Sequence, residues 1–163
     1  MVTSPNAYWL NFFLKRDINV LCWNYRGYGE SSQGFMETLS PYKCKRDAEY
    51  VMALLVNKLR LKGKIGVYGR SIGGVTACHL ANKYNNLVKS LISDRSFYEL
   101  STVLRDKCKG ECTNRIFDLV SWNWRTKNHS NYVTTKNCYK IITCDPLDDT
   151  VDQFGNLSSG VSQ

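Results

Sequence analysis

Short apolar runs recur along the chain and are separated by longer segments with helical spacing. The runs at 18–23, 65–68, 88–93 and 139–144 are nearly unbroken, which is typical of strands buried on both faces of a parallel sheet. The connections between them are too long for hairpins, so we expect crossovers through helices. The pattern predicts an α/β fold with a mostly parallel sheet and helices on both faces. We expect the strand at 65–68 in the centre of that sheet.

Two of the connecting segments have the features of helices. The first begins at Ser40, which offers an N-cap, and has Pro41 in its first turn; its apolar residues then recur at three- and four-residue steps until Gly63. The second, at 75–84, follows Gly74 and carries a stripe of small residues. Such a stripe lets a helix lie close against a sheet.

The length and composition fit one globular domain. The 163 residues are enough to bury a core without disulfides, and a hydrophobic share of 43% with a charged share of 22% excludes disordered, collagenous and low-complexity chains. We expect a single domain over residues 1–163. Within it, the aromatic-rich stretch at 97–131 predicts a helical cap or insertion, and the tail beyond Phe154 is rich in Gly and Ser without a pattern.

Charge and cysteine content narrow the function classes. The net charge is +8, but the basic residues are scattered rather than gathered in one tract, which favours a solvated surface over a nucleic-acid site. Seven cysteines at irregular spacing predict a reduced, intracellular compartment and no disulfide framework. Cys108 and Cys112 form one close pair, and the second half of a zinc site is missing nearby. We therefore expect neither a metal nor a cofactor.

The chain shows no segment for crossing a membrane. No apolar stretch approaches the run of about 18 residues that a membrane-spanning helix needs. We expect a cytoplasmic protein, while the positive charge leaves peripheral contact with acidic lipid headgroups open. No segment indicates a specific protein partner.

A five-residue motif carries the clearest chemistry. Gly69-Arg70-Ser71-Ile72-Gly73 fits G-x-S-x-G, and it lies between a predicted strand and a predicted helix. The Ser71 hydroxyl would project at the carboxyl end of the strand, the Ile72 N–H would stabilise an oxyanion, and glycines at 69 and 73 would permit the sharp turn. An N-capping serine on a tight turn is the alternative. A phosphate-binding loop is disfavoured because neither G-x-G-x-x-G nor G-K-[ST] occurs.

Two segments together resemble a known family. V-L-C-W-N-Y-R-G-Y-G-E-S-S at 20–32 and I-G-V-Y-G-R-S-I-G-G-V-T-A-C-H-L-A at 65–81 are similar to the α/β-hydrolases of the ABHD type, serine hydrolases often labelled serine-aminopeptidase-like. The resemblance covers roughly residues 6–151. It implies hydrolysis of an ester or thioester bond in a small acyl or lipid-like substrate, with Ser71 as the nucleophile.

The resemblance also implies an acid and a histidine. The segment I-I-T-C-D-P-L-D-D-T-V at 141–151 is similar to the family's seventh strand with its acid, which falls on Asp148, with Asp145 and Asp149 as rivals. The order in the family is nucleophile, acid, histidine, and no histidine follows Asp148 in this sequence. We expect His79 to be a packing or solvent-edge residue and His129 to be a solvated loop residue, so that His129 is only a fallback base.

Two hypotheses follow. In the first, the protein is a serine hydrolase in which Ser71 attacks, the Ile72 N–H stabilises the oxyanion and Asp148 orients a histidine that this sequence lacks. In the second, it is a non-catalytic hydrolase-fold fragment or pseudoenzyme that serves as a binding or scaffold module. The sequence resembles an incomplete hydrolase core without terminal strands, and we expect this chain alone to be inactive.

Overall fold

The computed structural model describes residues 8–31, 40–99, 126–145, 147 and 156–161. The chain divides into two compact units, 1–38 and 39–163. Most of the predicted cap at 97–131 lies outside the described residues, as do Asp148 and Asp149.

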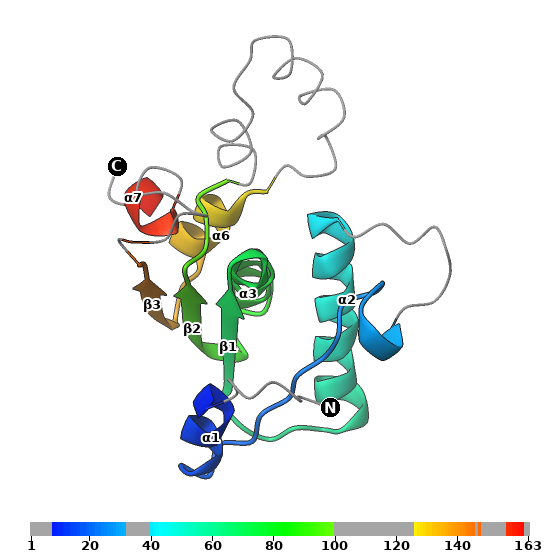
Figure 1. The fold of residues 1–163 in the computed structure, drawn as a ribbon. Coiled ribbons are helices and arrows are strands. Elements are labelled where there is room, and N and C mark those ends of the chain that lie inside the picture. Colours follow the sequence, from blue (N-terminus) through cyan, green and yellow to red (C-terminus); the bar gives the residue numbers. More distant parts are fainter. Residues whose placement is uncertain (1–7, 32–39, 100–125, 146, 148–155, 162–163) are drawn as a thin grey trace. The chain divides into compact units, whose positions relative to one another are not determined.

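The second unit contains a parallel sheet of three strands (Figure 1). They are β1 (Ile65–Arg70), β2 (Val88–Asp94) and β3 (Tyr139–Thr143), in that spatial order. Both neighbouring pairs are parallel, so the carboxyl ends of all three strands meet at one edge. The predicted parallel sheet with helices is confirmed, and these three strands lie where the apolar runs placed them.

The prediction of a central β1 is wrong for the described sheet, in which β2 is central and β1 lies at an edge. The predicted strand at 18–23 is also wrong, because these residues have no strand assignment. A strand is stabilised by hydrogen bonds to a neighbouring strand and by burial of its side chains. Here Ile18 and Leu21 remain 47% and 43% exposed, and no ladder is recorded for the described residues of this unit.

The described residues of the first unit, 8–31, form short local elements. Helix α1 (Tyr8–Leu14) leads into a turn at Asp17, and a single 3₁₀ turn, η1, spans Gly29–Ser31. Arg16 donates to the carbonyl of Phe12 at 2.9 Å and its guanidinium lies 3.8 Å from the centre of the Phe12 ring. These interactions are local in sequence and cap the end of α1.

Helix α2 (Pro41–Ala53) begins as the sequence predicts. The Ser40 hydroxyl accepts a hydrogen bond from the Lys43 N–H at 3.3 Å, and Pro41 occupies the first turn. The helix continues through a π-helical turn, η2 (Leu54–Lys58), and so ends before Gly63. Its buried residues Ala48 and Met52 face the core.

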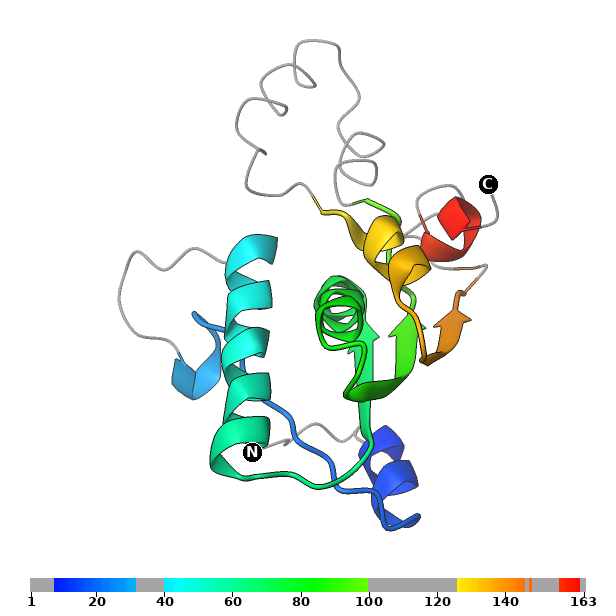
Figure 2. The same cartoon turned by 180° about the vertical axis from the view of Figure 1, so that it is seen from behind.

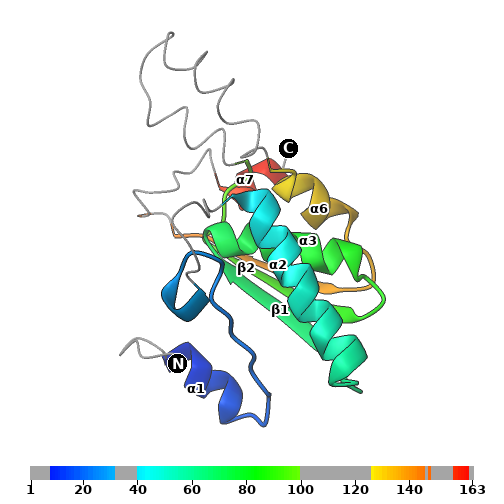
Figure 3. The same ribbon diagram turned by 90° about the vertical axis from the view of Figure 1, so that its right-hand side faces the viewer.

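Helix α3 (Ile72–Lys83) covers one face of the sheet. Its Ala77, Cys78 and Ala81 pack in one core with Val88 and Leu91 of β2. Figure 2 shows α3 between α2 and α6 (Asn128–Thr134), and Figure 3 looks from the α2 side toward α3 and the sheet behind it. On the other face the strands carry exposed side chains, which are Tyr68, Tyr139 and Ile141. Among the described residues, helices therefore cover mainly the face of the sheet on which α3 lies.

Two more short helices lie in the described part of the second unit. The sequence pattern predicted neither by its bounds, although the first begins within the stretch predicted as a helical insertion. Helix α6 (Asn128–Thr134) packs on α3, where the Asn82 amide donates to the Asn131 side chain at 3.2 Å. Helix α7 (Leu157–Val161) lies in the tail that showed no pattern, yet Leu157 is fully buried in the core. The Asn156 side chain caps α7 by accepting from the Ser159 N–H at 3.0 Å.

A charged cluster joins α2 to α3. The Glu49 carboxylate lies 2.6 Å from His79 Nε2 and 2.7 Å from Lys83 Nζ. Burial lowers the pKa of His79, as do the charges of Lys45 and Lys83, and these effects outweigh the opposing one of Glu49. His79 is therefore a half-buried packing residue paired across two helices, in agreement with the sequence interpretation.

We expect the free energy of unfolding to fall as the pH drops below the ordinary His pKa of 6.5. The unfolded chain then binds a proton at His79 more readily than the folded chain, so stability present above that pKa is lost as the pH falls toward the lower folded value. In His79→Gln the amide keeps a donor for Glu49 and does not titrate. Urea unfolding measured across this pH range should show a weaker pH dependence in the variant.

Lys83→Gln is the matched control for this measurement. It removes the lysine cation beside Glu49 and should lower stability. Because burial is the main cause of the lowered His79 pKa and the Lys83 charge only a minor one, the pH dependence should flatten much less than in His79→Gln. If His79→Gln and the wild type lost stability equally on acidification, the assignment of that loss to His79 would be wrong.

Candidate functional site

Ser71 alone makes the turn from strand to helix. β1 ends at Arg70 and α3 begins at Ile72, and Ser71 between them has φ 53° and ψ −122°. A non-glycine residue at positive φ is strained, at a cost of order 1–3 kcal/mol, and persists only where its surroundings hold it. The Ser71 side chain makes no capping hydrogen bond to α3, which disfavours the interpretation as an ordinary N-cap.

Hydrogen bonds on both sides hold the Ser71 backbone in this conformation. Its N–H donates to the carbonyl of Asp94 at the end of β2 at 3.0 Å. Its carbonyl accepts from the Gly74 N–H at 3.0 Å and from the Ser96 hydroxyl at 2.9 Å. The last residue of β2 and the segment that follows it therefore fix both backbone polar groups of the strained residue.

Two glycines make this close approach sterically feasible. A Cβ at Gly69 would overlap the backbone carbonyl of Gly73, and one at Gly74 would lie 2.5 Å from the Ser96 Cβ and would also overlap the Ser96 hydroxyl. At Gly73 a Cβ would meet nothing within 4 Å. The expected steric need for glycine therefore holds at Gly69 and not at Gly73, and the second site that needs glycine is Gly74.

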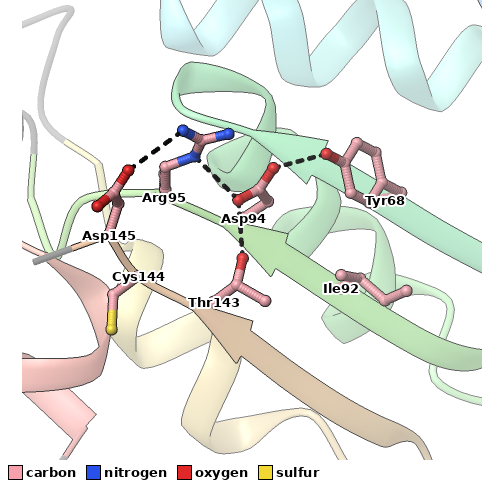
Figure 4. A pocket seen from close by; sticks show the side chains of 7 residues that line it. All are labelled: Tyr68, Ile92, Asp94, Arg95, Thr143, Cys144 and Asp145. Carbon is pink, nitrogen blue, oxygen red and sulfur yellow. Dashed lines mark hydrogen bonds and ion pairs between the residues drawn. The ribbon is translucent and has the colours of Figure 1, made fainter. Parts of the chain in front are cut away.

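A polar pocket lies at the carboxyl ends of the strands (Figure 4). The Asp94 carboxylate accepts hydrogen bonds from the Tyr68 hydroxyl of β1 at 2.7 Å and from the Thr143 hydroxyl of β3 at 2.7 Å. Arg95 lies 3.3 Å from the same carboxylate through Nε and 3.6 Å from Asp145 through Nη1. One carboxylate thus ties together the ends of all three strands.

The pKa shifts in this pocket follow from these contacts. Burial and the hydrogen bond to Asp94 raise the pKa of Tyr68 to about 12, so Tyr68 is neutral and donates. Burial alone would raise the pKa of Asp94, but the hydroxyls of Tyr68 and Thr143 and the charge of Arg95 outweigh it and lower the pKa. The Asp94 carboxylate is therefore ionised at neutral pH and accepts hydrogen bonds from the Tyr68 and Thr143 hydroxyls.

The structure does not gather the predicted acid and histidine residues around Ser71 within the part of the chain that it describes. Asp145 begins the turn after β3, where its carboxylate accepts from the Leu147 N–H at 3.1 Å and faces Arg95. Asp148 and Asp149 lie outside the described residues. His129 was expected in a solvated loop, but it lies in α6, half-buried, with its ring 4.7 Å from that of Tyr98. Ser71 is not among the residues that line the pocket.

The described part of the chain offers no cluster of three His, Cys, Asp or Glu side chains that could hold a metal ion. Cys78 is deeply buried, and burial raises its pKa to about 12, which makes it an unreactive core thiol. Cys108 and Cys112 lie outside the described residues.

Sequence reasoning missed the polar residues that support Ser71. Ser96 and Asn128 are both buried, and Asn128 donates to the Ser96 hydroxyl at 3.2 Å. Asn128 lies in the stretch 97–131, whose aromatic residues predicted a cap. Nothing in the sequence near Asn128 indicated a contact with Ser71. For Asp94 there was a signal, since a charged residue at the carboxyl end of a buried strand lies at the edge where sites are built.

Comparison with known proteins identifies the family. Residues 5–107 match the family described as alpha/beta hydrolase fold, which is more than half of the chain. The chain belongs to this family. The match includes β1, Ser71 and α3, and the α/β-hydrolase fold accounts for a parallel sheet followed by a helix at this point.

Individual relatives cover smaller parts. The chain is 28% identical over 113 residues to the Saccharomyces cerevisiae "Uncharacterized membrane protein YNL320W", which covers 64% of this chain and 38% of that protein. It is 31% identical over 93 residues to the Schizosaccharomyces pombe "Protein bem46", which covers 57% of this chain and 30% of that protein. It is 38% identical over 74 residues to the Bacillus subtilis "Uncharacterized protein YqkD", which covers 42% of this chain and 22% of that protein. The chain therefore spans well under half the length of these relatives. None of the helices in the described ranges is long and apolar enough to cross a membrane.

We expect opposite effects from alanine at neighbouring glycines of α3. Gly74→Ala should lower the free energy of unfolding by about 2–3 kcal/mol because its Cβ collides with Ser96. Gly73→Ala should raise it by about 0.5–1 kcal/mol because alanine favours the helix and nothing obstructs its Cβ. Chemical unfolding of the two variants beside the wild type measures both effects. Equal stability of the two variants would contradict the close contact between α3 and Ser96.

Proposed function

We propose that this α/β-hydrolase domain serves a serine hydrolase that cleaves ester or thioester bonds, with Ser71 as the nucleophile. The observation that carries the proposal is the strained conformation of Ser71 at the junction of β1 and α3. Strain of this kind is retained at functional sites, where a side chain must be presented in one direction. A serine that only capped the helix would not need a positive φ.

The reaction would proceed by acyl transfer. The Ser71 oxygen attacks the carbonyl carbon while a general base takes its proton, and the Ile72 N–H stabilises the oxyanion that forms. The carbon–oxygen or carbon–sulfur bond of the substrate then breaks, and the alcohol or thiol leaves with a proton from the base. Water attacks the acyl-serine in the second half and releases the acid.

The base is not assigned to a histidine of this sequence. His79 is paired with Glu49 between α2 and α3, and His129 packs against Tyr98. Asp148 stays our proposal for the acid, on the family resemblance, because it follows β3 in the sequence. Asp145 is less suited, since its carboxylate is already engaged by the Leu147 N–H and by Arg95.

The substrate proposed is a small acyl or lipid-like ester. One relative is named as a membrane protein, and this chain carries a net charge of +8, which would favour peripheral contact with an acidic lipid surface.

Chemical modification of Ser71 tests the proposal on this chain. The folded protein is treated with a fluorophosphonate in the presence of imidazole, which supplies a general base. We expect mass spectrometry to find the phosphonyl group on Ser71 and to find that imidazole accelerates its addition.

Two variants control for nonspecific modification. Ser71→Ala should not be labelled, whereas Ser90→Ala, which removes a hydroxyl from the middle of β2, should be labelled like the wild type. A folded protein that is not modified at Ser71 with imidazole present would overturn the proposal and favour a non-catalytic module.

A further inference from the structure

The strongest observation beyond the motif itself is a buried chain of hydrogen bonds that ends on Ser71. Asn128 of α6 is fully buried, and Ser96, two residues after β2, is 2% exposed. The Asn128 amide donates to the Ser96 hydroxyl at 3.2 Å, and that hydroxyl donates to the Ser71 carbonyl at 2.9 Å. Three segments far apart in the sequence thus meet behind the strained residue.

The direction of this chain is fixed by its donors and acceptors. The Asn128 Nδ2 group also donates to the carbonyl of Phe97 at 2.6 Å. Because a carbonyl only accepts, Phe97 determines that the NH₂ end of the Asn128 amide faces Ser96. The Ser96 oxygen therefore accepts from Asn128 and its proton is directed to the Ser71 carbonyl.

Holding the Ser71 carbonyl also sets the direction of the next N–H. The peptide unit between Ser71 and Ile72 is planar and trans, so the Ile72 N–H points opposite to the Ser71 C=O. The carbonyl is held toward the buried side by Ser96 and by the Gly74 N–H. The Ile72 N–H, which has no intrahelical acceptor at the start of α3, is thereby turned away from the buried side.

We propose that Ser96 and Asn128 are positioning residues that aim the Ile72 N–H at the oxyanion. This inference rests on the proposed function, because it assigns a role within the Ser71 reaction. Neither residue touches the substrate. Both act through the Ser71–Ile72 peptide, whose orientation must be set before the reaction for the N–H to stabilise developing charge.

The test compares labelling rates of Ser71 by the fluorophosphonate, with imidazole present, in wild type and Ser96→Ala. We expect the maximal labelling rate to fall about tenfold or more, since a misdirected oxyanion donor loses part of its 10²–10³ effect, while the half-saturating probe concentration stays the same. Ser96→Cys, which places a somewhat larger atom at the hydroxyl position and donates more weakly, should have a labelling rate between those of the wild type and Ser96→Ala.

Thr135→Val is the matched control. Thr135 is 3% exposed and its hydroxyl donates to the Asn131 carbonyl at 2.6 Å, so the variant loses a comparable buried hydrogen bond that does not involve Ser71. We expect its labelling rate to equal that of the wild type. Equal rates in Ser96→Ala and the wild type, or an equal loss in Thr135→Val, would overturn the proposal.

A second readout separates this inference from the proposed function. Residual dipolar couplings report the direction of the Ile72 N–H bond, which should change in Ser96→Ala while the N–H bonds later in α3 keep their directions. If wild-type Ser71 is never labelled, the proposed function fails, and an unchanged Ile72 coupling would then overturn the positioning role as well. A changed Ile72 coupling would support it independently of any reaction.

Discussion

The hydrogen bonds from the end of β2 and the residues just after it to the backbone of Ser71 are the constraint on which the site depends. Ser71 occupies a conformation that a serine disfavours, and the carbonyl of Asp94 and the hydroxyl of Ser96 hold its N–H and its C=O. Both contacts require α3 to start immediately beside β2. The absence of side chains at Gly69 and Gly74 makes that approach sterically feasible, and the core contacts of Ala77, Cys78 and Ala81 stabilise it.

Asp94 connects this constraint to the rest of the sheet. Its carbonyl binds the Ser71 N–H, and its carboxylate accepts from Tyr68 and Thr143 on the two neighbouring strands. A residue placed in this way fixes the relative positions of three strand ends and of the turn at once. The same parallel arrangement brings Arg95 and Asp145 to the edge where an α/β-hydrolase builds its site, so fold and candidate chemistry depend on the same few contacts.

The sequence pattern predicted the features that depend on residues close together in the sequence. The helix start at Ser40-Pro41, the strands at β1, β2 and β3 and the Ser71 turn follow from caps, apolar runs and a motif in its context. The strand prediction at 18–23 was wrong because an apolar stretch forms a strand only beside a neighbouring strand, and the sequence pattern does not show whether such a neighbour is present. The roles of Ser96 and Asn128 were not predicted because they depend on tertiary contacts with Ser71, which lies 25 residues from Ser96 and 57 residues from Asn128 in the sequence. The burial of Leu157 was not predicted because it depends on where the C-terminal tail packs, and its Gly- and Ser-rich neighbours give no sign of this.

The backbone conformation of Ser71 in solution tests the central claim most directly. In a residue with positive φ the amide proton and the Hα of the same residue lie close together, whereas in ordinary helix or strand they lie farther apart. A nuclear Overhauser measurement on isotopically labelled protein therefore distinguishes the two conformations. The account predicts a strong contact between these two protons in Ser71 at φ near 53° and a weak one in Val75 within α3. A weak contact in Ser71, equal to that in Val75, would contradict it.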